Sequence, residues 1–132
     1  MNEVLKFLKD NHTFYLATIE NNEPRVRPFG FIMEYEEKIY FCTNNTKNVS
    51  KQLKANPSFE VTSASADYKW IRLKGKAVFD SSSAAKAKAF EAAPFLADMY
   101  KTPDNPIFEV FYVKDGEATI YSMDGGAKKI KL

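Results

Sequence analysis

Two groups of polar residues in this sequence have the composition of an anion-binding site. The first is the pair Arg25 and Arg27, which an extended strand would place on one face because strand side chains alternate. The second is a polar run at the start of an expected helix, where the first backbone N–H groups lack helical acceptors and favour an anion. Its members carry hydroxyl, amide or ammonium groups: Thr43, Asn44, Asn45, Thr46, Lys47, Asn48 and Lys51. Together the two groups predict a phosphate site in which arginine acts as a bidentate donor.

Each group also has an ordinary structural explanation. The polar run fits a capped surface helix that carries lysines. The arginines could instead form ion pairs with nearby glutamates, such as Glu23, Glu36 or Glu37. Local chemistry supports both interpretations, an anion site or a set of surface ion pairs, and does not choose between them.

Few other side chains could carry chemistry. The sequence has one histidine, His12, and one cysteine, Cys42, so it holds neither a histidine cluster for a metal nor an internal disulfide. Cys42 falls within an expected strand, which favours a core position over a nucleophile. We assign no catalytic residue and no metal ligand, and expect any chemistry to come from a bound cofactor. Trp70 heads a row of lysines and an arginine on one strand face, which indicates contact with a ligand or partner.

The totals describe one domain over residues 1–132, long enough for a core without disulfides. The net charge of +2 is too small to indicate nucleic-acid binding. The first eleven residues are charged throughout, unlike a signal peptide, and no apolar run reaches the length of a membrane span. We therefore expect a cytoplasmic protein with no membrane and no nucleic-acid partner, and the single cysteine fits that compartment.

The chain must position these residues with a β-rich framework. Alternation and turn residues predict strands at 13–19, 25–33, 38–43, 58–64 and 69–80, and a final hairpin of 107–114 with 117–123 that turns at Asp115-Gly116. Helices are expected at 2–10, from the polar run to 55, at 84–93 and at 94–100. Pro28 cannot donate to a ladder, so its strand is an edge or is bulged. Six or seven strands without parallel crossovers predict a mainly β fold, an antiparallel barrel with flanking helices.

Several segments, in this order and spacing, resemble a known family. They are FYLATI, NNEPRVRPFGF, IYFCTNNTKNVSKQLKANP and WIRLKGKAVF. The chain resembles the FMN-binding split-barrel superfamily that includes pyridoxamine 5′-phosphate oxidase, and is most similar to its small bacterial nitroimidazole-resistance-type and general-stress members. The resemblance implies a Greek-key-like split β-barrel that holds FMN at a homodimer interface.

The resemblance also implies roles for individual residues. Arg25, Val26 and Arg27 would line the ring and phosphate end of FMN, and Thr43 and Asn44 would contact the ring or ribityl chain. The phosphate ligands implied are Lys47, Asn48 and Lys51, and Trp70 would approach the cofactor across the interface. This sequence has Lys47-Asn48-Val49 where family members often have Ser or Arg-Lys. Its tail also lacks the Arg and His with which the vitamin B6 enzymes hold their substrate, so we do not expect pyridoxamine phosphate oxidation.

The resulting hypothesis is an FMN-dependent oxidoreductase that acts on a small-molecule substrate. The alternative is a stress protein that binds flavin, haem or a deazaflavin without turnover. A third interpretation is an OB-like barrel that binds single-stranded nucleic acid through aromatics and lysines, but lysine and glutamate are mixed along the chain and no basic stripe stands apart.

Overall fold

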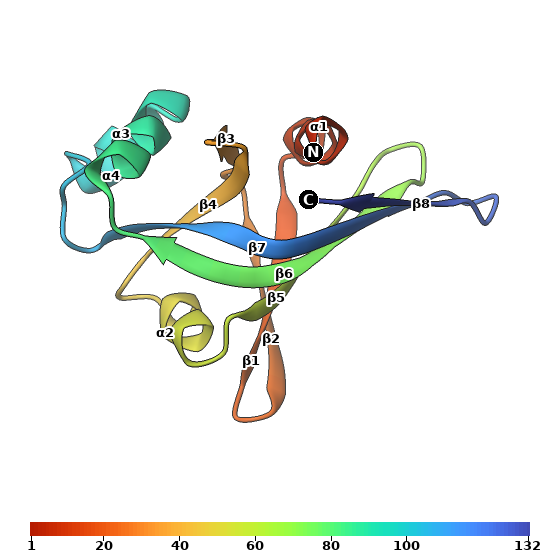
Figure 1. Cartoon of the computed structure of the whole chain (residues 1–132), viewed down its shortest axis with the longest axis horizontal. Coiled ribbons are helices and arrows are strands. Elements are labelled where there is room, and N and C mark those ends of the chain that lie inside the picture. The colour runs from red at the N-terminus through yellow and green to blue at the C-terminus, as the bar shows by residue number, and fades with distance from the viewer.

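The computed structural model describes residues 1–132, which form one eight-stranded antiparallel sheet and four helices (Figure 1). The strands are β1 (Phe14–Glu20), β2 (Glu23–Phe29), β3 (Met33–Tyr35), β4 (Lys38–Asn44), β5 (Ser58–Ala64), β6 (Trp70–Asp80), β7 (Phe108–Tyr121) and β8 (Ala127–Lys131). The helices are α1 (Asn2–Asp10), α2 (Asn48–Ala55), α3 (Ser83–Ala92) and α4 (Phe95–Tyr100).

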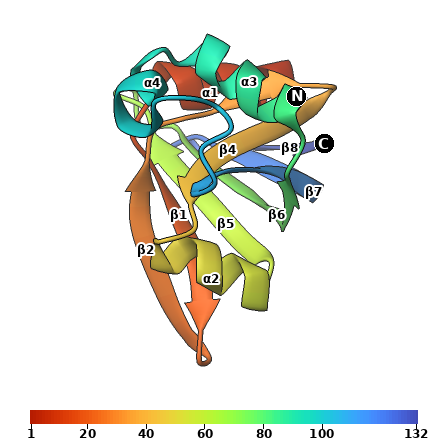
Figure 2. The same ribbon diagram turned by 90° about the vertical axis from the view of Figure 1, so that its left-hand side faces the viewer.

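The strand order is β2-β1-β5-β6-β7-β4-β3, with β8 added beside β7. Figure 1 shows β6 and β7 as long curved ribbons, and in Figure 2 the β1–β2 hairpin projects at one end beside α2. β2 is an edge strand, as Pro28 predicted. The predicted mainly β, antiparallel fold class is confirmed, with eight strands instead of six or seven.

Two hydrophobic cores lie on opposite faces of β4 and β7. The larger core contains Phe41 and Phe111 together with residues of α1 and α2, such as Leu8 and Leu53. The smaller core packs Ala85, Leu96 and other residues of α3 and α4 on the far side of the same two strands. Both faces of β4 are therefore buried, and α2 and α4 are fixed on either side of the end of this strand (Figure 2).

The predicted hairpin at Asp115-Gly116 is wrong, because β7 runs through these residues without turning. β6 pairs with both halves of β7, and the register shifts between Lys74 and Lys76, so that Gly75 faces a bulge in β7. Asp115 has a φ of 54°, and this left-handed conformation makes the bulge instead of a turn. The chain reverses at 122–126 instead, and its basic tail pairs with β7 as strand β8.

The expected strand over residues 25–33 is also divided. β2 ends at Phe29, the chain crosses from one edge of the sheet toward the other, and a short β3 begins at Met33. No helix is both long and apolar enough to span a membrane.

Candidate functional site

Arg25 and Arg27 lie on the same face of β2, as the alternation predicted. Their partners on β1 are Thr18 and Leu16, which are both buried, so the arginines point toward the inside of the sheet. Val26 pairs with Ala17, and its side chain is 68% exposed on the opposite face. The contribution of Val26 to this site is therefore its backbone.

The two arginines differ in how their charges are compensated. Arg25 lies at the surface, where it donates to the Pro24 carbonyl at 3.0 Å and forms ion pairs with Glu20 at 3.5 Å and Glu23 at 3.8 Å. The alternative explanation from the sequence, that the arginines form ion pairs with nearby glutamates, therefore holds for Arg25. It does not hold for Arg27, which forms no ion pair.

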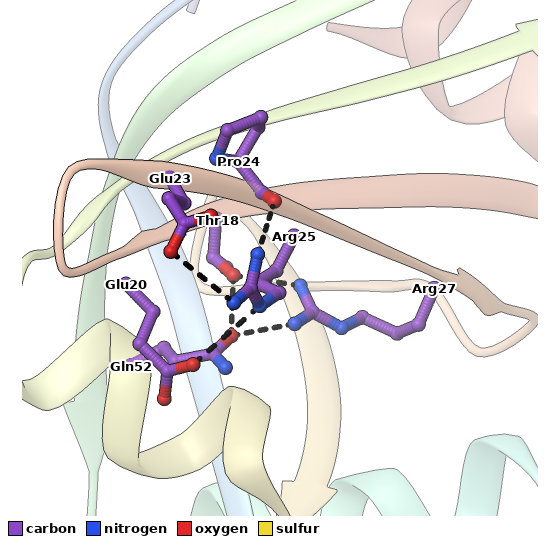
Figure 3. Close-up of polar contacts among 7 residues, drawn as sticks. All are labelled: Thr18, Glu20, Glu23, Pro24, Arg25, Arg27 and Gln52. Atoms are coloured by element: carbon purple, nitrogen blue, oxygen red, sulfur yellow. Dashed lines mark hydrogen bonds and ion pairs between the residues drawn. The ribbon is translucent and has the colours of Figure 1, made fainter.

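Arg27 is held by neutral acceptors (Figure 3). Its Nη1 donates to the Leu16 carbonyl at 3.1 Å and to Thr18 Oγ1 at 2.8 Å, and its Nη2 donates to Gln52 Oε1 at 2.5 Å. Burial lowers the pKa of the Arg27 guanidinium, and the field of Glu20 partly opposes that shift. Arginine stays protonated in proteins despite such a shift, so a half-buried positive charge remains here without a paired carboxylate.

The first turn of α2 has no side-chain cap. The helix begins after Lys47, whose backbone is extended and whose side chain does not cap it, so the expected capping by Thr43 to Thr46 is wrong. The N–H groups of Asn48 and Val49 consequently have no acceptor in the chain. An uncapped helix start of this kind binds anions through its free N–H groups and its dipole.

Asn44 uses its side chain to shape the turn before α2. Its Oδ1 accepts from the backbone N–H of Thr46 at 3.0 Å and from the Thr46 hydroxyl at 2.5 Å. Its Nδ2 donates to the hydroxyl of Tyr100 at 2.9 Å, and Asn44 is buried. These contacts fix the turn to α4, and they occupy the side chain that was predicted to contact a cofactor.

Thr43 has a buried hydroxyl group with no hydrogen-bond partner. The residue is 4% exposed, and its Oγ1 is the only buried side-chain polar atom in the chain that lacks a partner. An unsatisfied buried polar group costs free energy, so it marks a position where a ligand atom would be stabilising.

Two adjoining hollows surround these groups. The apolar cavity has a volume of about 470 Å³ and is walled by phenylalanines, by α4 and by the end of β4. Its lining residues are His12, Thr13, Arg27, Pro28, Phe29, Gly30, Phe31, Cys42, Thr43, Lys47, Val49, Phe95, Leu96, Met99 and Tyr100. The cationic hollow has a volume of about 410 Å³ and is lined by Glu20, Arg25, Val26, Arg27, Pro28, Lys47, Asn48, Val49 and Gln52.

The two hollows share four lining residues, two of which are cationic. Arg27 and Lys47 line both, as do Pro28 and Val49. A ligand that spans them would place a flat apolar part among the phenylalanines and an anionic part at the start of α2. The candidate site is therefore suited to a planar ring that carries a phosphate.

Three of the predicted site residues line neither hollow, namely Asn44, Lys51 and Trp70. Lys51 lines a separate hollow beyond Gln52, with a volume of about 350 Å³. Trp70 lines neither the apolar cavity nor the cationic hollow. It stacks on Tyr121, with 5.1 Å between ring centroids and 13° between the planes, and Arg72 lies 5.3 Å from the same tyrosine ring.

Sequence reasoning missed several residues of the site. Gln52 is 5% exposed and lies on the buried side of α2 beside Val49 and Leu53. The sequence did contain a signal for Gln52, because a polar glutamine on the apolar face of a helix needs a buried hydrogen-bond partner. The α4 residues Phe95 and Met99 gave no local signal, because only the tertiary fold brings them to the cavity.

Cys42 lines the apolar cavity but is not poised for nucleophilic chemistry. Burial raises the pKa of its thiol from the ordinary 9 to about 12, and the field of Lys47 offsets only part of that effect. The thiol is therefore protonated at neutral pH, and its side chain is half-buried at the edge of the smaller core.

The fold and site define this protein as a mainly β protein of the split-barrel class, with a cationic hollow beside an apolar cavity. Residues 1–122 match the family model for pyridoxamine 5′-phosphate oxidase, and the chain belongs to that family. No curated protein matches the sequence significantly.

Solved structures agree with this membership. A NimC/NimA family protein from Clostridium acetobutylicum is 44% identical, with a TM-score of 0.96 over 100% of this chain and 92% of that one. General stress protein 26 from Bacillus anthracis is 20% identical, with a TM-score of 0.75 over 98% of this chain and 97% of that one. A pyridoxamine 5′-phosphate oxidase-related, FMN-binding protein from Nostoc punctiforme is 15% identical, with a TM-score of 0.62 over 99% and 95%. The last two likenesses concern the fold alone.

Proposed function

We propose that the protein binds FMN, with the phosphate in the cationic hollow and the ring in the apolar cavity. The observation that carries this proposal is that the uncapped start of α2 adjoins a cavity walled by aromatic side chains. Thr43, whose buried hydroxyl has no hydrogen-bond partner, is one of the residues that line this cavity. The donors present fit the cofactor: a guanidinium, an ammonium and two free backbone N–H groups face the hollow where a phosphate would lie.

Individual residues would divide the work of holding FMN. Lys47, Arg27 and the N–H groups of Asn48 and Val49 would bind the phosphate. Phe29 and Phe31 would wall the ring on one side and exclude water, and the Thr43 hydroxyl would hydrogen-bond a polar atom of the ring or ribityl chain. Bound FMN would supply two-electron redox chemistry at its ring.

We further propose that the protein is an oxidoreductase acting on a small molecule. The apolar cavity has room beside the aromatic walls, and the α4 side chains Phe95 and Met99 are exposed at its border. Oxidation of pyridoxamine phosphate is not part of this proposal, since the tail carries no Arg and no His.

A homodimer completes the proposal. The outer face of β1 and β2 carries the exposed apolar side chains Tyr15, Ile19 and Val26, and no helix of the chain covers it. A symmetric pairing of this face would bury these side chains. Trp70 of a second copy would reach the cofactor only through such a pairing.

The test is the absorbance spectrum of the purified protein and its titration with FMN and riboflavin. We expect a flavin spectrum, or uptake of added FMN with quenching of its fluorescence, and tighter binding of FMN than of riboflavin. Anaerobic bleaching by NADH or NADPH would support turnover, whereas bound flavin that no reductant bleaches would favour the non-catalytic alternative. A Soret band would point to haem, and a protein that takes up no FMN would refute the proposal.

A further inference from the structure

Gln52 lies at the centre of the contacts that hold Arg27. Its Oε1 accepts two hydrogen bonds, at 2.5 Å from Arg27 Nη2 and at 2.6 Å from the Thr18 hydroxyl (Figure 3). Thr18 in turn accepts from Arg27 Nη1 at 2.8 Å. The buried amide oxygen thus joins α2, β1 and β2 at one point.

These contacts leave one edge of the guanidinium free. A guanidinium has five N–H donors, and Arg27 uses two on Nη1 and one on Nη2. Nε–H and the second Nη2–H remain without acceptors. In a planar guanidinium these two N–H groups point to the same side, and this pair is the fork that binds two oxygens of a phosphate or carboxylate.

The charge of Arg27 also has no carboxylate as a direct partner. All three of its acceptors are neutral oxygens, whereas Arg25 on the same strand has two carboxylates within 4 Å. Glu20 is the one carboxylate that lines the cationic hollow, and it pairs with Arg25. A glutamate in place of Gln52 would have nearly the same shape but would neutralise Arg27, so the amide is the group that orients the guanidinium and preserves its charge.

Gln52 also fixes Arg27 relative to the free helix amides. Gln52 follows Asn48 by one turn of α2, and Asn48 and Gln52 line the same hollow as Arg27. The hydrogen bond that Arg27 donates to Gln52 Oε1 therefore sets the distance between the guanidinium and the start of α2. The guanidinium on β2 and the free N–H groups at the start of α2 are thus held at a distance at which both can bind the same anion.

We propose that Gln52 is a positioning residue that makes the site select phosphorylated ligands, by orienting Arg27 without neutralising it. This inference rests on the proposed function, because it assigns Gln52 a role in the same phosphate site. It concerns selectivity for the phosphate and not affinity for the ring.

The test compares FMN with riboflavin in two variants. In Gln52→Glu the preference for FMN over riboflavin is expected to fall about tenfold, because an ion pair now competes with the phosphate. The matched control is Ser50→Ala on the same helix. Ser50 is also buried, and it donates to Glu109 of β7 at 2.5 Å and makes no hydrogen bond with Arg27. This control is expected to lower stability and leave the preference unchanged, so a preference that falls equally in both variants would reduce Gln52 to a structural role.

Inorganic phosphate supplies a readout that is independent of flavin. Phosphate is expected to raise the thermal midpoint of the wild-type protein, and to raise that of Gln52→Glu much less. If Gln52→Glu does not fold, Gln52→Met removes the acceptor without adding charge, and its preference for FMN is expected to fall roughly threefold. An unchanged preference in the folded variants overturns the role of Gln52 while FMN binding stands. A wild-type protein that binds no FMN overturns both proposals.

Discussion

The side-chain amide of Asn44 donates a 2.9 Å hydrogen bond to the hydroxyl of Tyr100, two residues that are far apart in sequence and both buried. This bond joins the turn before α2 to the helix that walls the apolar cavity. One polar contact thus fixes the turn before α2 to a wall of the apolar cavity.

Replacing Tyr100 by phenylalanine should lower stability. The buried amide of Asn44 would lose its acceptor, at a cost of about 1–3 kcal/mol in the free energy of unfolding. Urea denaturation measures this change. Tyr121→Phe is the matched control, since no hydrogen bond of the chain involves the Tyr121 hydroxyl, and a similar loss in both variants would contradict the importance of the Asn44 contact.

Replacing Thr43 by valine should have opposite effects on stability and on binding. The isosteric change removes an unsatisfied buried hydroxyl, so the ligand-free protein should become more stable by about 1 kcal/mol. FMN affinity should fall roughly fivefold to tenfold, because the ligand loses one hydrogen bond. Chemical denaturation without flavin and fluorescence titration with flavin test the two signs separately, and a variant that binds FMN as tightly as the wild type would remove Thr43 from the site.

Lys47 and Lys51 should differ in their effects on FMN. Lys47 borders both hollows of the site, so Lys47→Ala should weaken FMN about tenfold and riboflavin little, as expected for a lost charge-assisted contact. Lys51 lines a separate hollow, and Lys51→Ala should change FMN binding by less than about threefold. The reverse order in calorimetric titrations would place the phosphate beyond Gln52.

Replacing Gly75 by alanine tests the continuous β7 strand. A Cβ at residue 75 would lie 2.5 Å from Val113 Cγ1 and 3.0 Å from the Lys114 carbonyl oxygen. Relief of this overlap should cost about 1–3 kcal/mol of stability. Gly30→Ala is the control, since its Cβ would meet only the His12 carbonyl at 3.5 Å, and equal stability of the two variants would be inconsistent with the bulge.

Cys42 should give the stability a specific pH dependence. Its pKa is raised from 9 to about 12 in the folded state, so between these values the unfolded chain loses the thiol proton and the folded protein keeps it. Stability linked to this thiol is complete below pH 9 and declines as the pH rises toward 12. The difference in unfolding free energy between wild type and Cys42→Ala should shift in favour of the alanine variant over this range, and a constant difference would contradict the burial of the thiol.

The sequence was sufficient for features that depend on local pattern. The helix at 2–10 and the strand at 58–64 have the predicted bounds, and the two arginines share a face because alternation in a strand is a local rule. Pro28 limited its strand to an edge or a bulge, because the loss of its N–H is a property of the residue alone, and β2 is an edge strand.

The features that were not predicted depend on contacts between residues that are distant in sequence. Asp115-Gly116 has the composition of a hairpin turn. However, β6 is long enough to pair with β7 on both sides of these two residues, so they form a bulge instead of a turn. Likewise, the neighbouring sequence does not show that Arg25 has carboxylate partners and Arg27 has none. Gln52 reaches Arg27 because α2 packs beside β1 and β2, and that packing separates a paired arginine from one that is free to bind an anion.

The membership of β7 in both cores has a consequence for the synthesis of the protein. Phe111 and Val113 of this strand complete the larger core, and Phe108 and Val110 complete the smaller one. A nascent chain that has emerged only as far as α4 has β4 and β6 without their common partner, so neither core can close. Stable tertiary structure must therefore wait until the C-terminal quarter has left the ribosome, and until then the unpaired edges of β4 and β6 are open to pairing with other chains.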